Sequence, residues 1–134
     1  MFIAISHIFL KRAQADPAHT REHVRSALKY RDKAVPIASD QELGWYSMNT
    51  VKELAAITEM AGDLSTEERC VQYRNSLRLR KVLKARLQDK AEEIARRIVA
   101  KPEDLTVADV QCLSDQNNES IRLAEEKQAK LSCR

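Results

Sequence analysis

The stretch TEERCVQYRNSLRLRKVLKARLQDKAEEIARRIVA, residues 66–100, decides the fold of this protein. It contains neither proline nor glycine, and its apolar residues recur every three or four positions, which is the period of an α-helix. At about 1.5 Å per residue, such a helix is roughly 50 Å long. A compact domain of this chain length is only about 36 Å across. We therefore expect a central helix that either bends near Asn75 and Ser76 or protrudes and needs a partner.

The composition indicates a helical protein and not a sheet protein. The chain has 134 residues, enough for one domain, and 43% are apolar and 32% charged, but only 4% are aromatic. Strands favour aromatic residues, and their connections need turn residues, whereas this chain has only two glycines. We expect one all-α domain over 1–134, a bundle of four to six helices built around residues 66–100. The two glycines, Gly44 and Gly62, cannot form a glycine-rich phosphate-binding motif, which argues against dinucleotide and P-loop chemistry.

Prolines and capping residues divide the rest of the chain into further helices. Asp16 followed by Pro17 predicts a helix start, and the helix expected over 17–34 ends before Pro36. In a capping box, Ser or Thr is followed three residues later by an acidic residue, which predicts starts at Ser39, Thr50, Ser65 and Thr106. Residues 40–61 are thus expected to form one broken helix or two short helices.

The helix expected over 107–132 carries a seam with the spacing of a heptad repeat: Val110, Ser114, Asn117, Ile121, Ala124, Gln128 and Leu131. Three of these seven residues are polar, so the seam is weak by itself. A polar residue such as Asn117 can set the register of a helix pair, but the composition favours a frayed and solvated helix. We therefore expect this helix to be loosely packed.

The first twelve residues, MFIAISHIFLKR, form an apolar segment. About ten apolar positions are too few for the roughly 30 Å of a bilayer core, and apolar residues precede the charges, unlike in a secretory signal. On a helical wheel the apolar residues surround the axis. This favours burial in the core or in a subunit contact over a membrane-interface anchor through Lys11 and Arg12. Segment 1–12 is therefore a candidate interface, including one in a homo-oligomer, and we expect no membrane partner.

The most basic block of the chain covers residues 69–101, with eleven basic and three acidic side chains. Acidic helices packed beside this block would neutralise it within the bundle. Alternatively the cations form a functional ridge, with Arg74, Arg78 and Lys81 on one side of the helix, opposite the leucines. Such a ridge suits an acidic surface of another protein or a phosphate backbone. The expected binding residues are Arg74, Arg78, Arg80, Lys81, Lys84 and Arg86.

Trp45 and Tyr46 lie beside Gly44, between two of the predicted capping boxes. Aromatic side chains in a loop can anchor a partner. A lone tryptophan in a small bundle more often closes the end of the core. Both residues are candidate partner anchors.

Residues 19–23 read His-Thr-Arg-Glu-His, the H-x-x-E-H order of inverzincin metallopeptidases. On a helix, His19 and His23 share a face on which they could bind zinc, with Glu22 as the general base. The motif lacks a third protein ligand, and the cations of Arg21 and Arg25 disfavour a metal ion. We therefore expect the match to be a coincidence, with no catalytic residue, no metal and no cofactor.

Cys70, Cys112 and Cys133 lack the close spacing of a zinc ribbon or a thioredoxin-like site. An odd number of cysteines fits a reducing compartment, so we expect a cytoplasmic protein.

These patterns predict a non-enzymatic helical adaptor, inhibitor or accessory subunit. It would bind a larger protein assembly through the basic ridge and its apolar segments. The alternative is a nucleic-acid-binding protein that contacts the phosphate backbone without reading sequence. A zinc metallopeptidase is a remote third interpretation, resting on residues 19–23 alone.

Overall fold

A computed structural model of the chain describes residues 2–44, 46–56, 64–96 and 105–133. Its regular elements are α1 (Phe2–Ala15), a 3₁₀ turn η1 (Pro17–His19), α2 (Thr20–Ala34), α3 (Asp40–Gly44), α4 (Met48–Ala56), α5 (Thr66–Arg96) and α6 (Val107–Lys130). The predictions of an all-α fold and of a long central helix are therefore confirmed. Residues 97–100, the expected end of that helix, lie outside the described residues.

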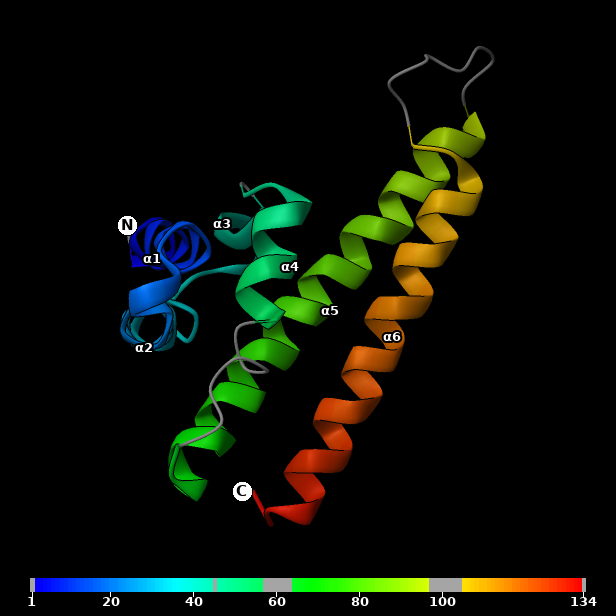
Figure 1. The fold of residues 1–134 in the computed structure, drawn as a ribbon. Coiled ribbons are helices and arrows are strands. Elements are labelled where there is room, and N and C mark those ends of the chain that lie inside the picture. Colours follow the sequence, from blue (N-terminus) through cyan, green and yellow to red (C-terminus); the bar gives the residue numbers. More distant parts are fainter. Residues whose placement is uncertain (1, 45, 57–63, 97–104, 134) are drawn as a thin grey trace.

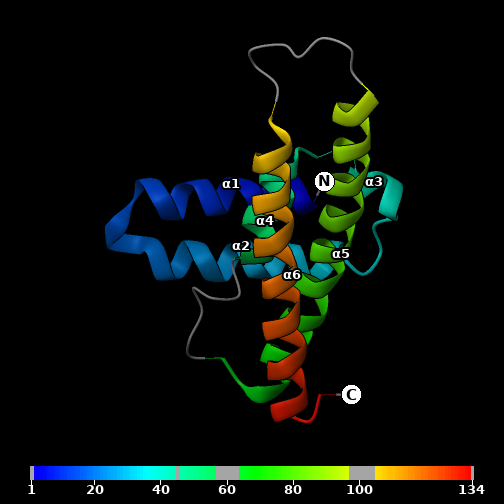
Figure 2. The ribbon, with the colours of Figure 1, turned by 90° about the vertical axis from the view of Figure 1, so that its right-hand side faces the viewer.

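The helices form two hairpins that cross each other (Figures 1 and 2). Helices α1 and α2 pack side by side as one hairpin, and α5 and α6 pack side by side as the other. Helix α4 lies between them, in contact with both α1 and α5, and the short α3 packs against α5. None of the helices in the described part of the chain has the length and apolar character needed to cross a membrane.

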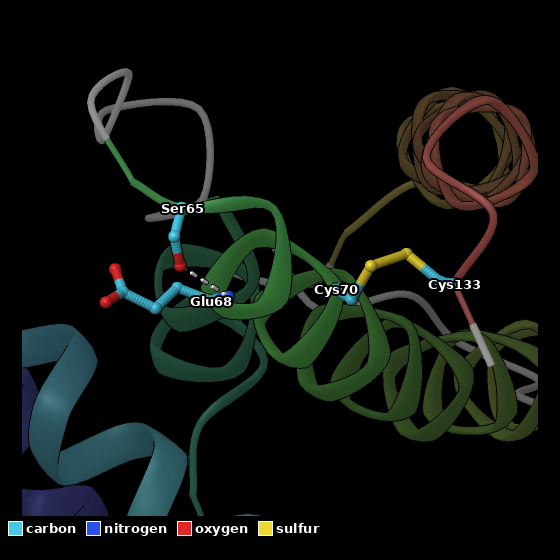
Figure 3. Close-up of a disulfide and its surroundings, with 4 residues drawn as sticks. All are labelled: Ser65, Glu68, Cys70 and Cys133. Carbon is cyan, nitrogen blue, oxygen red and sulfur yellow. Dashed lines mark hydrogen bonds between the residues drawn. A yellow bond between two sulfur atoms is a disulfide. The ribbon is translucent and has the colours of Figure 1, made fainter.

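Helix α5 begins where its capping residue predicts. The backbone N–H of Glu68 donates to Ser65 Oγ at 3.2 Å, which satisfies one of the free amides of the first turn (Figure 3). The recurring apolar residues of this stretch include a leucine stripe of Leu79, Leu83 and Leu87, which is buried in the core. Burial of this stripe holds the middle of α5 against the rest of the molecule.

Helix α4 begins three residues earlier than predicted. The hydroxyl of Ser47, and not that of Thr50, caps it, because the N–H of Thr50 donates to Ser47 Oγ at 3.1 Å. The predicted start at Thr50 is therefore wrong: Thr50 occupies the third position of the first turn. Glu53 is left to face α1, where its carboxylate lies 3.3 Å from the ammonium of Lys11. The prediction at Ser39 is confirmed by the bond from the N–H of Glu42 at 3.0 Å.

The helix predicted over 17–34 is divided into η1 and α2, because Asp16 does not cap it. The Asp16 carboxylate instead bonds the rings of His19 and His23, at 3.0 and 3.3 Å. The hydroxyl of Thr20, the first residue of α2, donates to the carbonyl of Ala13 at 3.1 Å. The α1–α2 corner is thus held by side chains on both sides of the turn.

A buried arginine joins three helices at the crossing of the hairpins. Arg31 of α2 has no exposed surface, and it donates to the carbonyl of Leu54 in α4 at 3.2 Å and to Ser76 Oγ in α5 at 3.0 Å. Its neighbour Asp32 accepts from Arg31 Nη2 at 3.0 Å and from Asn75 Nδ2 of α5 at 3.0 Å. Burial lowers the pKa of Arg31, and the charge of Asp32 opposes that shift.

This network also explains why α5 continues as a helix through Asn75 and Ser76, where a bend was one expectation. Both side chains are bonded to α2: Ser76 accepts from Arg31, and Asn75 donates to Asp32. Asn75 and Ser76 therefore hold α2 against α5 and do not bend α5.

Replacing Arg31 with methionine should lower the free energy of unfolding by roughly 3–5 kcal/mol, because Asp32 and Ser76 lose a buried partner. Urea denaturation followed by circular dichroism measures the loss. Lys29→Met, an exposed change on the same helix, should stay within about 1 kcal/mol of the parent. Equal losses in the two variants would contradict a structural role for the buried guanidinium.

Helix α6 packs along α5 through the predicted seam, centred on Asn117. Asn117 is only 2% exposed; its Nδ2 donates to the backbone carbonyl of Arg80 at 2.9 Å, and its Oδ1 accepts from Arg80 Nη1 at 3.3 Å. The only other fully buried residue of α6 is Val110. Helix α6 is thus regular to Lys130, but only two of its residues, Val110 and Asn117, are fully buried.

Asn117→Ala should destabilise the protein by roughly 1–3 kcal/mol, because a backbone carbonyl and a guanidinium of α5 lose a buried partner. Asn118→Ala provides a matched control, since Asn118 is the same residue type on the exposed face of α6. Thermal or urea unfolding of both variants checks the difference. Because alanine has the higher helix propensity, Asn118→Ala should be neutral or slightly stabilising, and a loss equal to that of Asn117→Ala would contradict a role for the buried amide.

Cys70 and Cys133 form a disulfide, with their Cα atoms 5.5 Å apart (Figure 3). Cys112 is free and exposed. The expectation of a reducing compartment rested on the odd cysteine count, and this pairing removes that ground. The bond joins residues 63 positions apart in sequence. Closing that loop lowers the conformational entropy of the unfolded chain, which raises the free energy of unfolding by about 4 kcal/mol in the chain-entropy model. The disulfide joins the first turns of α5 to the residues that follow α6.

Candidate functional site: a basic groove on α5

A groove of about 650 Å³ runs along the face of α5 that carries the predicted ridge. We call it the basic groove. Its cations are Arg74, Arg78, Lys81 and Arg86, its apolar residues are Leu77, Val82 and Ala85, and α6 contributes Gln128. The structure therefore brings together four of the six predicted cations, around an apolar surface that the ridge prediction did not include.

The helical period accounts for the grouping. Residues three and four apart on a helix are neighbours on its surface, so Arg74, Arg78 and Lys81 follow one another along a single side. Val82 and Ala85 lie one turn beyond Arg78 and Lys81, which places apolar and cationic side chains next to each other. From Arg74 to Arg86 the groove follows α5 for about 18 Å.

Two arginines of the groove also hold α3 in place. A guanidinium N–H of Arg78 donates to the carbonyl of Ala38, and one of Arg86 donates to the carbonyl of Tyr46. These two carbonyls lie just before and just after α3, so both ends of that short helix are fastened to α5. A neutral carbonyl does not cancel the charge of a guanidinium, so the bond to Tyr46 leaves Arg86 its attraction for an anion.

The exposed cations of the ridge are not neutralised by the carboxylates that the structure describes. Among the described residues, Arg74, Lys81 and Lys84 are exposed and make no ion pair. Like charges one turn apart on a helix destabilise it by a few tenths of a kcal/mol per pair. Binding of an anion in the groove would relieve that repulsion.

Two acidic residues of α6, Glu119 and Glu126, pair with cations of α6 itself. Arg122 bonds Glu119 at 2.6 Å and Glu126 at 3.0 Å, and Lys130 lies 3.2 Å from Glu126. The hydrogen bond from Arg122 lowers the pKa of Glu119, and that from Lys130 lowers the pKa of Glu126. The pKa of Arg122 is raised in turn, chiefly by Glu119. These carboxylates are therefore committed within α6 and do not neutralise the groove.

Arg80 and Lys84 lie outside the groove. Arg80 is only 9% exposed and its guanidinium contacts Asn117 of α6, because position 80 lies on the side of α5 that faces α6. Lys84 is exposed but does not line the groove. The ridge that the sequence predicts is therefore shorter and more compact than the cation count suggests.

Of the two predicted aromatic anchors, Trp45 lies outside the described residues. Tyr46 is half-buried, packs against the core and supplies the carbonyl that Arg86 bonds. Leu77, Val82 and Ala85 have no expected role in the site from the sequence, which places Gln128 only in the α6 seam. The heptad spacing of Gln128 in that seam was the sequence signal that could have placed it beside α5.

The histidine motif forms a different arrangement from a zinc site. One oxygen of Asp16 lies 3.0 Å from His19 Nδ1 and 3.3 Å from His23 Nε2. Within the part of the chain that the structure describes, no three His, Cys, Asp or Glu side chains are placed to hold one metal ion. The bond from His23 is the main cause that lowers the pKa of Asp16.

The Asp16 carboxyl should titrate below its ordinary pKa of 3.8. Because the folded pKa is depressed, its contribution to stability is present above pH 3.8 and is lost as the pH falls through the folded pKa. NMR titration of the carboxyl carbon measures the midpoint. His23→Gln should raise the midpoint towards 3.8, whereas Glu22→Gln should leave it unchanged; a midpoint that His23→Gln does not move would contradict the assignment.

Comparison of the chain with protein families, curated proteins and solved structures gives no match.

Proposed function

We propose that this protein is a non-enzymatic adaptor, inhibitor or accessory subunit whose basic groove binds an acidic amphipathic helix of another protein. The observation that carries the proposal is the composition of the groove. Four cations surround three apolar side chains along about three turns of α5.

The apolar residues favour a protein segment as the occupant. Leu77 is already buried, with 7% of its surface exposed, so Val82 and Ala85 offer the apolar surface that gains free energy when apolar side chains cover it. A phosphate backbone has no such groups. An amphipathic helix has leucine-like side chains at every third or fourth position, and grooves between helices commonly bind helices of this kind.

The cations specify the charge of that helix. Glutamates that flank its apolar stripe would lie opposite Arg74 and Lys81, which are exposed, and opposite the anchored Arg78 and Arg86. Arginine bonds carboxylates through two parallel N–H groups, which gives such contacts directionality as well as charge. Rim charges of this kind act mainly on the rate of association and on partner choice.

Duplex DNA is the competing occupant, and the burial of Arg80 counts against it. Backbone binding gains from a long run of accessible cations. Here Arg80 is buried against Asn117, so one cation of the predicted run is not accessible to a phosphate backbone.

A labelled synthetic helix with a leucine stripe flanked by glutamates tests the proposal by fluorescence anisotropy. It should bind the parent protein at least about tenfold more tightly than a peptide with glutamine in place of glutamate. A peptide with alanine in place of leucine should also bind more weakly, because the apolar residues of the groove remain uncovered.

Matched protein variants locate the contact. Arg74→Glu combined with Lys81→Glu should weaken binding of the acidic peptide at least about tenfold. Lys84→Glu combined with Lys29→Glu changes the net charge equally, at exposed sites outside the groove, and should have little effect. Equal losses in both double variants would reject the groove as the site. Tighter binding of a duplex DNA probe than of the peptide, with affinity falling steeply as salt rises, would favour the nucleic-acid alternative.

A further inference from the structure

The disulfide lies at one end of the basic groove. Cys70 precedes Arg74 by one helical turn, and Cys133 follows Gln128 by five residues. In Figure 3 the bond joins α5 to the chain segment that leaves α6. The covalent link thus connects the two helices whose residues line the groove.

The C-terminal half of α6 depends on this link more than the N-terminal half does. The two fully buried residues of α6, Val110 and Asn117, both belong to its first half. From 118 to 133, the described residues are exposed or only partly buried. Arg122 and Lys130 bond carboxylates of α6 itself, so these ion pairs do not hold the helix to α5.

A further contact in this half is weak. The ammonium of Lys127 lies 5.9 Å from the ring centroid of Tyr73, a cation–π contact at an exposed site. The position of Gln128 against α5 therefore relies on partial side-chain burial and on the disulfide.

We propose that the Cys70–Cys133 disulfide is a redox switch for the basic groove, an inference that rests on the proposed function. In the oxidised protein the bond keeps the second half of α6 against α5 and completes the groove. In the reduced protein that half separates from α5, and Gln128 no longer lines the groove. The acidic helix then binds more weakly, because it loses a preformed wall of its site.

The switching step is a thiol–disulfide exchange with a dithiol reductant. A thiolate of the dithiol attacks one sulfur of the bond, forms a mixed disulfide and displaces the other cysteine as a thiolate. The second thiol of the reductant then closes its own disulfide and releases the remaining cysteine. Two electrons and two protons pass from the reductant to Cys70 and Cys133. Both cysteines are partly exposed, so a reductant can approach them.

The remainder of the fold does not depend on this bond. The Arg31 network joins α2, α4 and α5, and the Asn117 contact holds the first half of α6. Reduction is therefore expected to release one half-helix and to leave the helical core in place.

The test compares the oxidised full-length chain with the same chain treated with dithiothreitol. Hydrogen exchange should rise in residues 118–130 on reduction and stay nearly constant in residues 66–96. Affinity for the leucine–glutamate peptide should fall at least about fivefold. Cys133→Ser should reproduce the reduced state without a reductant. Cys112→Ser, which removes the free exposed thiol, should behave like the parent in both redox states.

The outcomes separate the two proposals. Unchanged exchange in residues 118–130 after reduction overturns the switch, whatever the peptide does. Loss of the helical circular dichroism signal on reduction also overturns it, because the bond would then be a general structural cross-link. Faster exchange with unchanged peptide affinity shows that α6 moves without controlling the groove, and rejects the switch as well. Failure of the peptide to bind in either state rejects the proposed function, and the switch with it, even where exchange shows release of α6.

Discussion

The buried guanidinium of Arg31 is the constraint on which the rest of the structure depends. A charge withdrawn from water is tolerated only where nearly all of its donors are bonded, and its partners here come from α2, α4 and α5. Apolar contacts alone tolerate small slides between helices. A guanidinium with bonded partners on three helices prevents such slides, because they would break its hydrogen bonds. Arg31 therefore fixes how the two hairpins cross.

That crossing determines which face of α5 is left open. The leucine stripe is covered by the core, and the side carrying Arg80 is covered by α6. On the remaining face, Arg78 and Arg86 fasten both ends of α3, and Arg74 and Lys81 stay exposed. The basic groove is therefore the part of α5 that the crossing hairpins leave uncovered. Its two anchored arginines link the shape of the site to the fold.

Helix α6 is attached in a different way from the other long elements. It has two fully buried residues, one buried amide contact and one covalent bond, whereas α2 and α5 share the buried network. Stability is thus distributed unevenly along the molecule, and elements with few buried contacts are those that open locally at low cost. The side of the basic groove formed by α5 is therefore held by the core, whereas the side to which α6 contributes Gln128 is held by fewer buried contacts.

The sequence by itself determined the features that depend on neighbours along the chain. The all-α class, the cap at Ser65, the leucine stripe and the common side of Arg74, Arg78 and Lys81 all follow from helical periodicity and capping chemistry. Only the tertiary structure decided the burial of Arg31 and Arg80, the pairing of Cys70 with Cys133 and the apolar lining of the groove. The physical reason is that burial and pairing depend on which distant segments meet. A charged residue has the same local pattern in sequence whether it faces solvent or an acceptor on another helix.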